Sequence, residues 1–228
     1  MKIEKLHTGL YHIKFDSQYQ ITSTFMRLQE FYESPYEDIR GQYVSYEKVI
    51  DRYAKDTGEF SYFTDWSGFN VPSSAFKDFF KWTHAPSIFP YLSKEYNLWN
   101  LVRGKLFEDG LDIDDNFYLI ATYIDGDILH EVAHGLYFLD DNYKKDMNIL
   151  IEGYKDRKNF SASLLDMCYC KDLVDDEIQA YLSTSDTVSL RTYIPSAKKC
   201  SIPDEFGETL EKYLKKYKVK YNGNLLKI

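Results

Sequence analysis

The chain has 228 residues, of which 44% are hydrophobic and 17% are aromatic, and its net charge is −8. A chain of this size and composition can bury a substantial core, which excludes an intrinsically disordered protein. The negative charge disfavours nucleic acid and anionic membranes as partners. We find no apolar segment typical of a signal peptide or a transmembrane helix, and three cysteines make a poor disulfide framework. We therefore expect a cytoplasmic protein in a reducing environment.

Hydrophobic periodicity predicts the elements of the first half of the chain. The expected elements are a strand at 10–15, helices at 22–32 and 45–54, a strand-like run from Phe60 that ends in a turn at Gly68 and Pro72, and a largely helical stretch at 73–107 broken at Pro86 and Pro90. Ser45 is placed to cap the second helix. An acidic loop at 110–115 is the expected boundary between the N-terminal and C-terminal portions.

The second half is predicted to begin with a strand and to continue mostly as helices. Residues 116–124 are rich in aromatic and β-branched side chains, which favours a strand. After a turn at 125–127, helices are expected to end near Leu139 and to cover about 143–156, 174–184 and 204–218. We expect residues 1–115 and 116–228 to pack as two parts of one integrated domain.

One short motif carries chemistry. His130-Glu131-Val132-Ala133-His134 matches the pattern HExxH. On a helix this spacing puts both imidazoles on one face, one turn apart, where they can hold a single Zn²⁺. Glu131 lies on the flank of that face, where its carboxylate can take a proton from a water that the metal activates.

The helical wheel supports this interpretation. The side chains that form the apolar stripe of this helix are Ile128, Leu129, Val132, Ala133 and Leu136. His130 and His134 fall outside the stripe, so we expect them to border the buried face and to open toward a cleft.

A catalytic zinc site needs a third protein ligand. Asp140 stands where an extended motif places its last ligand, but Tyr137 replaces the glycine that would turn the chain back to the metal. Glu152 and Glu177 are the alternatives on later helices. Glu177 is favoured because Ala180, three residues further on, is small enough to let its helix approach the motif helix closely.

The motif followed by a Glu-x-x-small helix resembles the catalytic core of gluzincins, a branch of the zincin metallopeptidases. The resemblance covers about residues 117–185. It implies an α+β, zincin-like fold, mostly helical, with a small mixed β-sheet next to the active-site helix. It also implies that the strand at 117–123 is the sheet edge that binds an extended substrate.

The resemblance further implies that His130, His134 and Glu177 bind Zn²⁺ and that Glu131 is the general base. Many gluzincins place an aspartate four residues after the ligand glutamate, where it orients the first histidine. Tyr181 stands there in this chain, so the partner of that histidine is not identified.

The expected activity is zinc-dependent hydrolysis of a peptide or protein substrate. A donor must also stabilise the tetrahedral oxyanion, and the candidates are Tyr181, Tyr193 and Arg191. The alternative is a zincin-fold binding or inhibitory protein with weak or no catalysis. The presence of Glu131 argues against that alternative, since a structural zinc site needs no general base. The substrate and the oligomeric state stay open.

Overall fold

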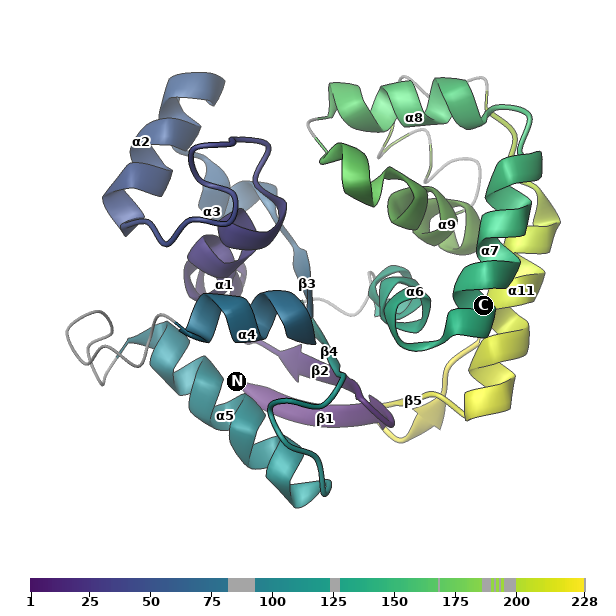
Figure 1. Cartoon of the computed structure of the whole chain (residues 1–228), viewed down its shortest axis with the longest axis horizontal. Coiled ribbons are helices and arrows are strands. Elements are labelled where there is room, and N and C mark those ends of the chain that lie inside the picture. Colours follow the sequence, from purple (N-terminus) through teal and green to yellow (C-terminus); the bar gives the residue numbers. More distant parts are fainter. Residues whose placement is uncertain are drawn as a thin grey trace. The chain divides into compact units, whose positions relative to one another are not determined.

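A computed structural model shows how these segments fold (Figure 1). The residues that it describes are 1–81, 93–123, 128–167, 169–185, 190, 192, 194 and 200–227. The contacts divide the chain into two compact units, Met1–Asp127 and Ile128–Ile228. The acidic loop at 110–115 and the strand that follows it both lie within the first unit.

The first unit contains a mixed four-stranded sheet. Its strands are β1 (Lys2–His7), β2 (Leu10–Lys14), β3 (Gly68–Pro72) and β4 (Tyr118–Thr122). Their order is β1-β2-β4-β3, in which β2 and β4 are parallel and the other two pairs are antiparallel. With helices forming most of the remaining structure, the coarse expectation of an α+β chain with a small mixed sheet is confirmed.

The position of β4 corrects one expectation. The strand at 117–123 was expected to be a sheet edge, but β4 pairs with β2 on one side and with β3 on the other. Its backbone groups therefore already have partners and cannot receive an added strand. All five of its residues are buried, which is typical of an interior strand.

The segment from Phe60 to Pro72 also differs from its prediction. The run that alternates like a strand contains the short helix α3 (Tyr62–Asp65), and the strand β3 lies where the turn was expected. Tyr62 is fully buried, so the aromatic residues of this run serve the core from a helical turn. Pro72 is tolerated in β3 because it ends an edge strand, where a missing N–H costs little.

Four helices in the described part of the first unit lie where helices were predicted. They are α1 (Gln18–Glu33), α2 (Tyr46–Thr57), α4 (Ser73–Lys81) and α5 (Lys94–Glu108). Helix α1 begins before the predicted residue 22 because the Ser17 side chain caps it, accepting a hydrogen bond from the Gln20 N–H. Ser45 caps α2 as predicted.

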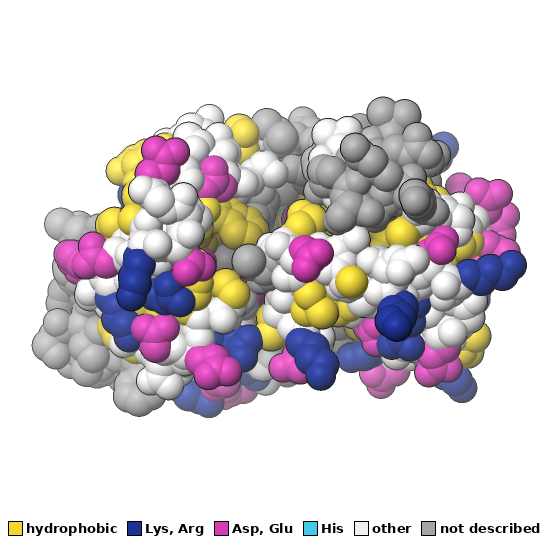
Figure 2. Space-filling model, turned by 90° about the horizontal axis from the view of Figure 1, so that it is seen from above, with side chains coloured by type: hydrophobic (Ala, Val, Ile, Leu, Met, Phe, Trp, Pro, Cys, Tyr) yellow, Lys and Arg dark blue, Asp and Glu magenta, His cyan; other side chains and the backbone are white. Residues whose placement is uncertain are grey.

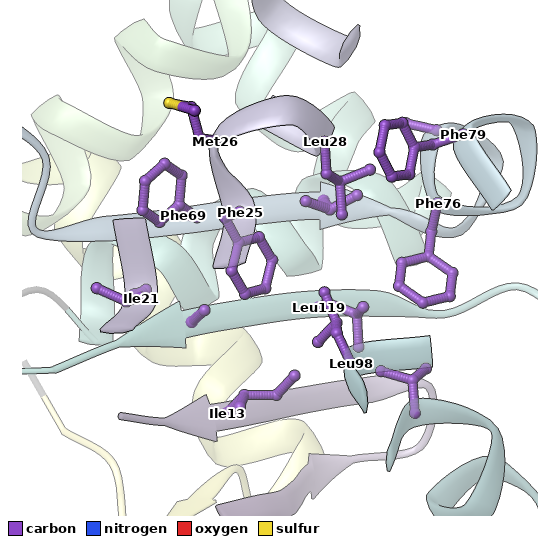
Figure 3. Close-up of a cluster of buried hydrophobic side chains, with 14 of the residues drawn as sticks. Ile13, Ile21, Phe25, Met26, Leu28, Phe69, Phe76, Phe79, Leu98 and Leu119 are labelled. Atoms are coloured by element: carbon purple, nitrogen blue, oxygen red, sulfur yellow. The ribbon is translucent and has the colours of Figure 1, made fainter. Parts of the chain in front are cut away.

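The core of the first unit lies between one face of the sheet and the helices α1, α4 and α5. Figure 3 shows Ile13, Phe69 and Leu119 of the strands together with Phe25 and Phe76 of the helices. All five are almost completely buried. Burial of these large side chains is the main favourable contribution to the stability of this unit.

The second unit is helical apart from a short hairpin. Its elements are α6 (Ile128–Leu139), α7 (Asp141–Gly153), α8 (Arg157–Asp166), the 3₁₀ turn η2 (Lys171–Leu173), α9 (Val174–Thr184), α11 (Asp204–Tyr217), β5 (Lys220–Tyr221) and β6 (Asn224–Leu225). Helix α9 packs against α6, α7, α8 and α11 (Figure 1). A helix held by four neighbours is a rigid support for the side chains it carries.

The surface carries charges of both signs. On the face shown in Figure 2, acidic and basic side chains are interspersed over the described residues. None of the helices in the described parts of the chain is both long and apolar enough to span a bilayer.

Replacing Phe25 by alanine should strongly destabilise the first unit. The Phe25 ring is fully buried and stacks on Phe69 at a centroid distance of 5.4 Å. Its loss should lower the free energy of unfolding by about 3–5 kcal/mol, measured by urea unfolding. The matched control is Phe107→Ala, because Phe107 is 84% exposed. Equal effects of the two substitutions would contradict the assignment of this core.

Candidate metal centre

Helix α6 brings the two histidines of the motif together. His130 and His134 are one helical turn apart, and their Nε2 atoms lie 3.2 Å from each other. Both ring nitrogens thus face the same point. This is the arrangement that the i, i+4 spacing predicts for two ligands of one ion.

Helix α9 supplies the third group. The Glu177 carboxylate places Oε1 3.7 Å from His134 Nε2 and Oε2 3.8 Å from His130 Nε2. One ligand atom from each of the three residues lies within 4.8 Å of the others. In the described parts of the chain this is the one group of at least three histidine, cysteine or acidic side chains that could hold a metal.

The two alternative third ligands lie elsewhere in the second unit. Asp140 caps helix α7, accepting hydrogen bonds from the N–H groups of Asn142 and Tyr143, and its other carboxylate oxygen accepts from the Tyr217 hydroxyl. Glu152 is exposed in the last turn of α7. The group that forms around the histidines therefore includes Glu177 and neither of the others.

The three residues fit a zinc ion by two criteria. Ligand atoms 2.0–2.2 Å from a tetrahedral Zn²⁺ lie roughly 3.3–3.6 Å from one another, and one ligand atom from each of the three residues lies within 4.8 Å of the others, so small side-chain movements would close the site around an ion. Glu177 Oε2 is buried and has no hydrogen-bond partner among the described residues. A buried carboxylate oxygen without a partner is costly, and coordination to a cation would satisfy it. Two imidazoles and a carboxylate are also a donor set that zinc accepts.

The expectation that both histidines open toward a cleft is only half right. The His130 side chain is 21% exposed, whereas the His134 side chain is 2% exposed. Helix α9 packs on α6 and brings Glu177 over His134. Glu131 is also buried, at 7% exposure. His130 is therefore the more exposed of the two histidines.

Burial and charge together shift the pKa values of this group. Burial lowers the pKa of His130 well below its ordinary value, and the charge of His134 lowers it further. Burial also lowers the pKa of His134, but the carboxylates of Asp176 and Glu177 outweigh burial and raise it to about 10. Burial raises the pKa of Glu177 to about 8, against the opposing effect of His134. The Glu131 carboxylate contributes to the last two shifts, so it lies within electrostatic range of both residues.

Asp176 is the residue at this site that the sequence analysis missed. Its Oδ1 atom lies 2.9 Å from His134 Nδ1. A carboxylate at this nitrogen favours the tautomer with a proton on Nδ1, which leaves the Nε2 lone pair for a metal. The signal in the sequence was the acidic run Asp175-Asp176-Glu177 in the first turn of α9, where negative charge is favoured by the helix dipole.

Tyr181 packs beside the first histidine. Its ring lies edge-on to the ring of His130 at a centroid distance of 4.6 Å, and its hydroxyl lies 3.0 Å from that of Tyr169. These contacts place Tyr181 next to a candidate ligand, and its role toward an oxyanion stays a prediction. The other two candidates for that role, Arg191 and Tyr193, lie outside the described residues.

Comparisons with protein-family models, with curated proteins and with solved structures find no match to this chain.

Glu177→Gln should abolish tight zinc binding. The amide is uncharged and a weaker ligand than the carboxylate, and the remaining two histidines leave the ion incompletely held. We expect one equivalent of Zn²⁺ in the wild type and an affinity lowered by about 100-fold or more in the variant, measured by competition with a chromophoric chelator.

The matched control for this experiment is Glu152→Gln, which makes the same change at an exposed position of a neighbouring helix. It should bind zinc as the wild type does. If the Glu152 variant lost zinc and the Glu177 variant retained it, Glu152 rather than Glu177 would be the third ligand.

Asp176→Asn should weaken zinc binding without abolishing it. An asparagine has the same shape but lacks the charge that fixes the His134 tautomer, and loss of such a partner typically costs about 10–100-fold in affinity. Asp175→Asn is the neighbouring control, since Asp175 pairs with Arg157 rather than with a histidine. Titration with the same chelator compares them, and similar affinities in the two variants would rule out the role given to Asp176.

Proposed function

We propose that this protein is a zinc-dependent metallopeptidase with a zincin-like fold, in which His130, His134 and Glu177 hold the metal. The observation that carries the proposal is the convergence of these three side chains, from two helices, on one point. The presence of Glu131 one residue after the first histidine adds the general base that hydrolysis requires. The substrate class that we propose is a peptide or protein.

The chemistry of each group indicates its role in the proposed hydrolysis. When bound, Zn²⁺ supplies a Lewis acid that polarises a carbonyl and lowers the pKa of a water molecule. Glu131 accepts one proton of the attacking water as its oxygen adds to the scissile carbonyl carbon. Glu131 then passes that proton to the amine nitrogen as the carbon–nitrogen bond breaks. Glu131 is buried, so few solvent molecules compete for its carboxylate.

Two residues support the ligands in this proposal. Asp176 faces the Nδ1 atom of His134 and keeps its Nε2 atom available. Tyr181 packs against the ring of His130 and limits its rotation. We also keep Tyr181 as a candidate donor to the oxyanion, in which case its hydroxyl would exchange its contact with Tyr169 for one with the substrate.

The second candidate is a zincin-fold protein that binds or inhibits without cleaving. The burial of the site favours it to some extent, because His134 and Glu131 are nearly inaccessible. Against it stands the cost of burying the Glu131 carboxylate within electrostatic range of Glu177, which a binding protein has no reason to bear. We therefore favour the peptidase.

Glu131→Gln should separate catalysis from metal binding. Because Glu131 is not in the ligand group, the variant should keep its one equivalent of zinc, while turnover should fall about 10²–10⁴-fold, the usual contribution of a general base. The measurement is cleavage of a proteome-derived peptide mixture, followed by mass spectrometry.

Glu152→Gln serves as the matched control and should cleave at the wild-type rate. Identical peptide patterns for wild type and Glu131→Gln, each fully loaded with zinc, would exclude peptidase activity and leave the binding protein.

A further inference from the structure

A chain of polar contacts runs from His134 away from the metal group. Asp176 Oδ1, which lies beside His134 Nδ1, also accepts a hydrogen bond of 2.9 Å from the Gln179 side-chain amide. The carbonyl oxygen of the same amide accepts a hydrogen bond of 2.9 Å from the Tyr143 hydroxyl. The chain therefore links α6, α9 and α7 through four side chains.

The outer two members of this chain are completely buried. Gln179 and Tyr143 are both 0% exposed. Burial raises the pKa of Tyr143 well above its ordinary value, so its hydroxyl keeps its proton and remains a donor. The amide of Gln179 is then fixed in one orientation, because its carbonyl end must face Tyr143 and its amino end must face Asp176.

We propose that Gln179 and Tyr143 are positioning residues of the metal centre, which hold the Asp176 carboxylate against His134. This inference rests on the proposed function, since it deepens the description of the same site. Helix α6 carries His134, and α9 carries Asp176 and Gln179. Helix α7 carries Tyr143, whose hydroxyl sets the orientation of the Gln179 amide. Metal affinity thus depends on a tyrosine that does not touch any ligand.

Packing alone does not account for this arrangement. An apolar side chain of similar size could fill the position of Gln179 between the helices without the cost of burying an amide. The glutamine matches both of its neighbours, donating to a carboxylate and accepting from a hydroxyl. Buried polar chains of this kind are stable only when every member is satisfied, and they then fix one geometry.

The test compares Gln179→Met, Tyr143→Phe and the double variant. We expect the zinc affinity to fall about tenfold for Gln179→Met and about threefold for Tyr143→Phe, at or below the range for second-layer partners. In the double variant the affinity should equal that of Gln179→Met, because the hydroxyl acts only through the amide. The Co²⁺-loaded Gln179→Met variant should also show shifted visible absorption bands, which report ligand geometry.

Tyr213→Phe is the matched control. Tyr213 packs edge-on against Tyr143, but its hydroxyl donates to Asp146 and not to this chain of contacts. It should keep wild-type zinc affinity and a wild-type Co²⁺ spectrum. Gln179→Met could also loosen the packing of the helices. Tyr143→Phe removes only one oxygen atom, so its effect on zinc affinity still tests the proposal in that case.

Two results would overturn the proposal. Wild-type affinity and spectrum in both Gln179→Met and Tyr143→Phe would show that the two residues serve packing only, while the proposed function would stand. Losses that add fully in the double variant would show that the residues act separately. A wild-type protein that takes up no Zn²⁺ or Co²⁺ would refute the proposed function together with this inference.

Discussion

The packing of α9 against α6 is the constraint on which the candidate site depends. The motif on α6 can bring together only two nitrogens. The third candidate ligand, Glu177, lies beside them because α9 packs against α6. Ala180 on α9 is fully buried, and a small side chain at such a position allows close packing of helices. Contacts of α9 with α7, α8 and α11 hold it in place, so that Glu177 and Asp176 meet the histidines in a fixed geometry.

The same packing buries negative charge, and the surrounding residues of the second unit compensate for only part of it. It buries Glu131 and Glu177, with Asp176 nearby, beside two imidazoles. The first turn of α9 lowers the cost, because the helix dipole favours its acidic residues, and Arg157 neutralises Asp175 at the surface. The helix dipole and Arg157 stabilise the charge of Glu177 less, and burial raises its pKa to about 8. A divalent cation at this group would offset the remaining negative charge and give the buried Glu177 Oε2 atom a partner.

The sequence predicts the local parts of this site and not the ones that depend on tertiary packing. His130 and His134 follow from spacing within one helix, and the helix at 174–184 was predicted at the bounds it has. Asp176 was missed because its contact with His134 depends on the angle at which α9 crosses α6. The β4 strand was recognised, but its interior position depends on pairing with β2, more than 100 residues earlier. Local periodicity carries no information on such pairings. Short or weakly patterned elements, such as β1 and α8, were missed as well.

The two histidines are supported in different ways, and this asymmetry has a chemical consequence. The gluzincin pattern places a carboxylate at the first histidine, whereas here an aromatic ring, Tyr181, packs against His130, and the carboxylate of Asp176 faces His134. A carboxylate at Nδ1 makes an imidazole a stronger ligand, so His134 is the more basic donor and also the more buried one. Of the two candidate ligands, His130 is the more exposed one and has no such carboxylate at its Nδ1 atom among the described residues. In the proposed metal centre, the ion would be held more firmly on the side of α9, and a substrate would approach from the side of His130.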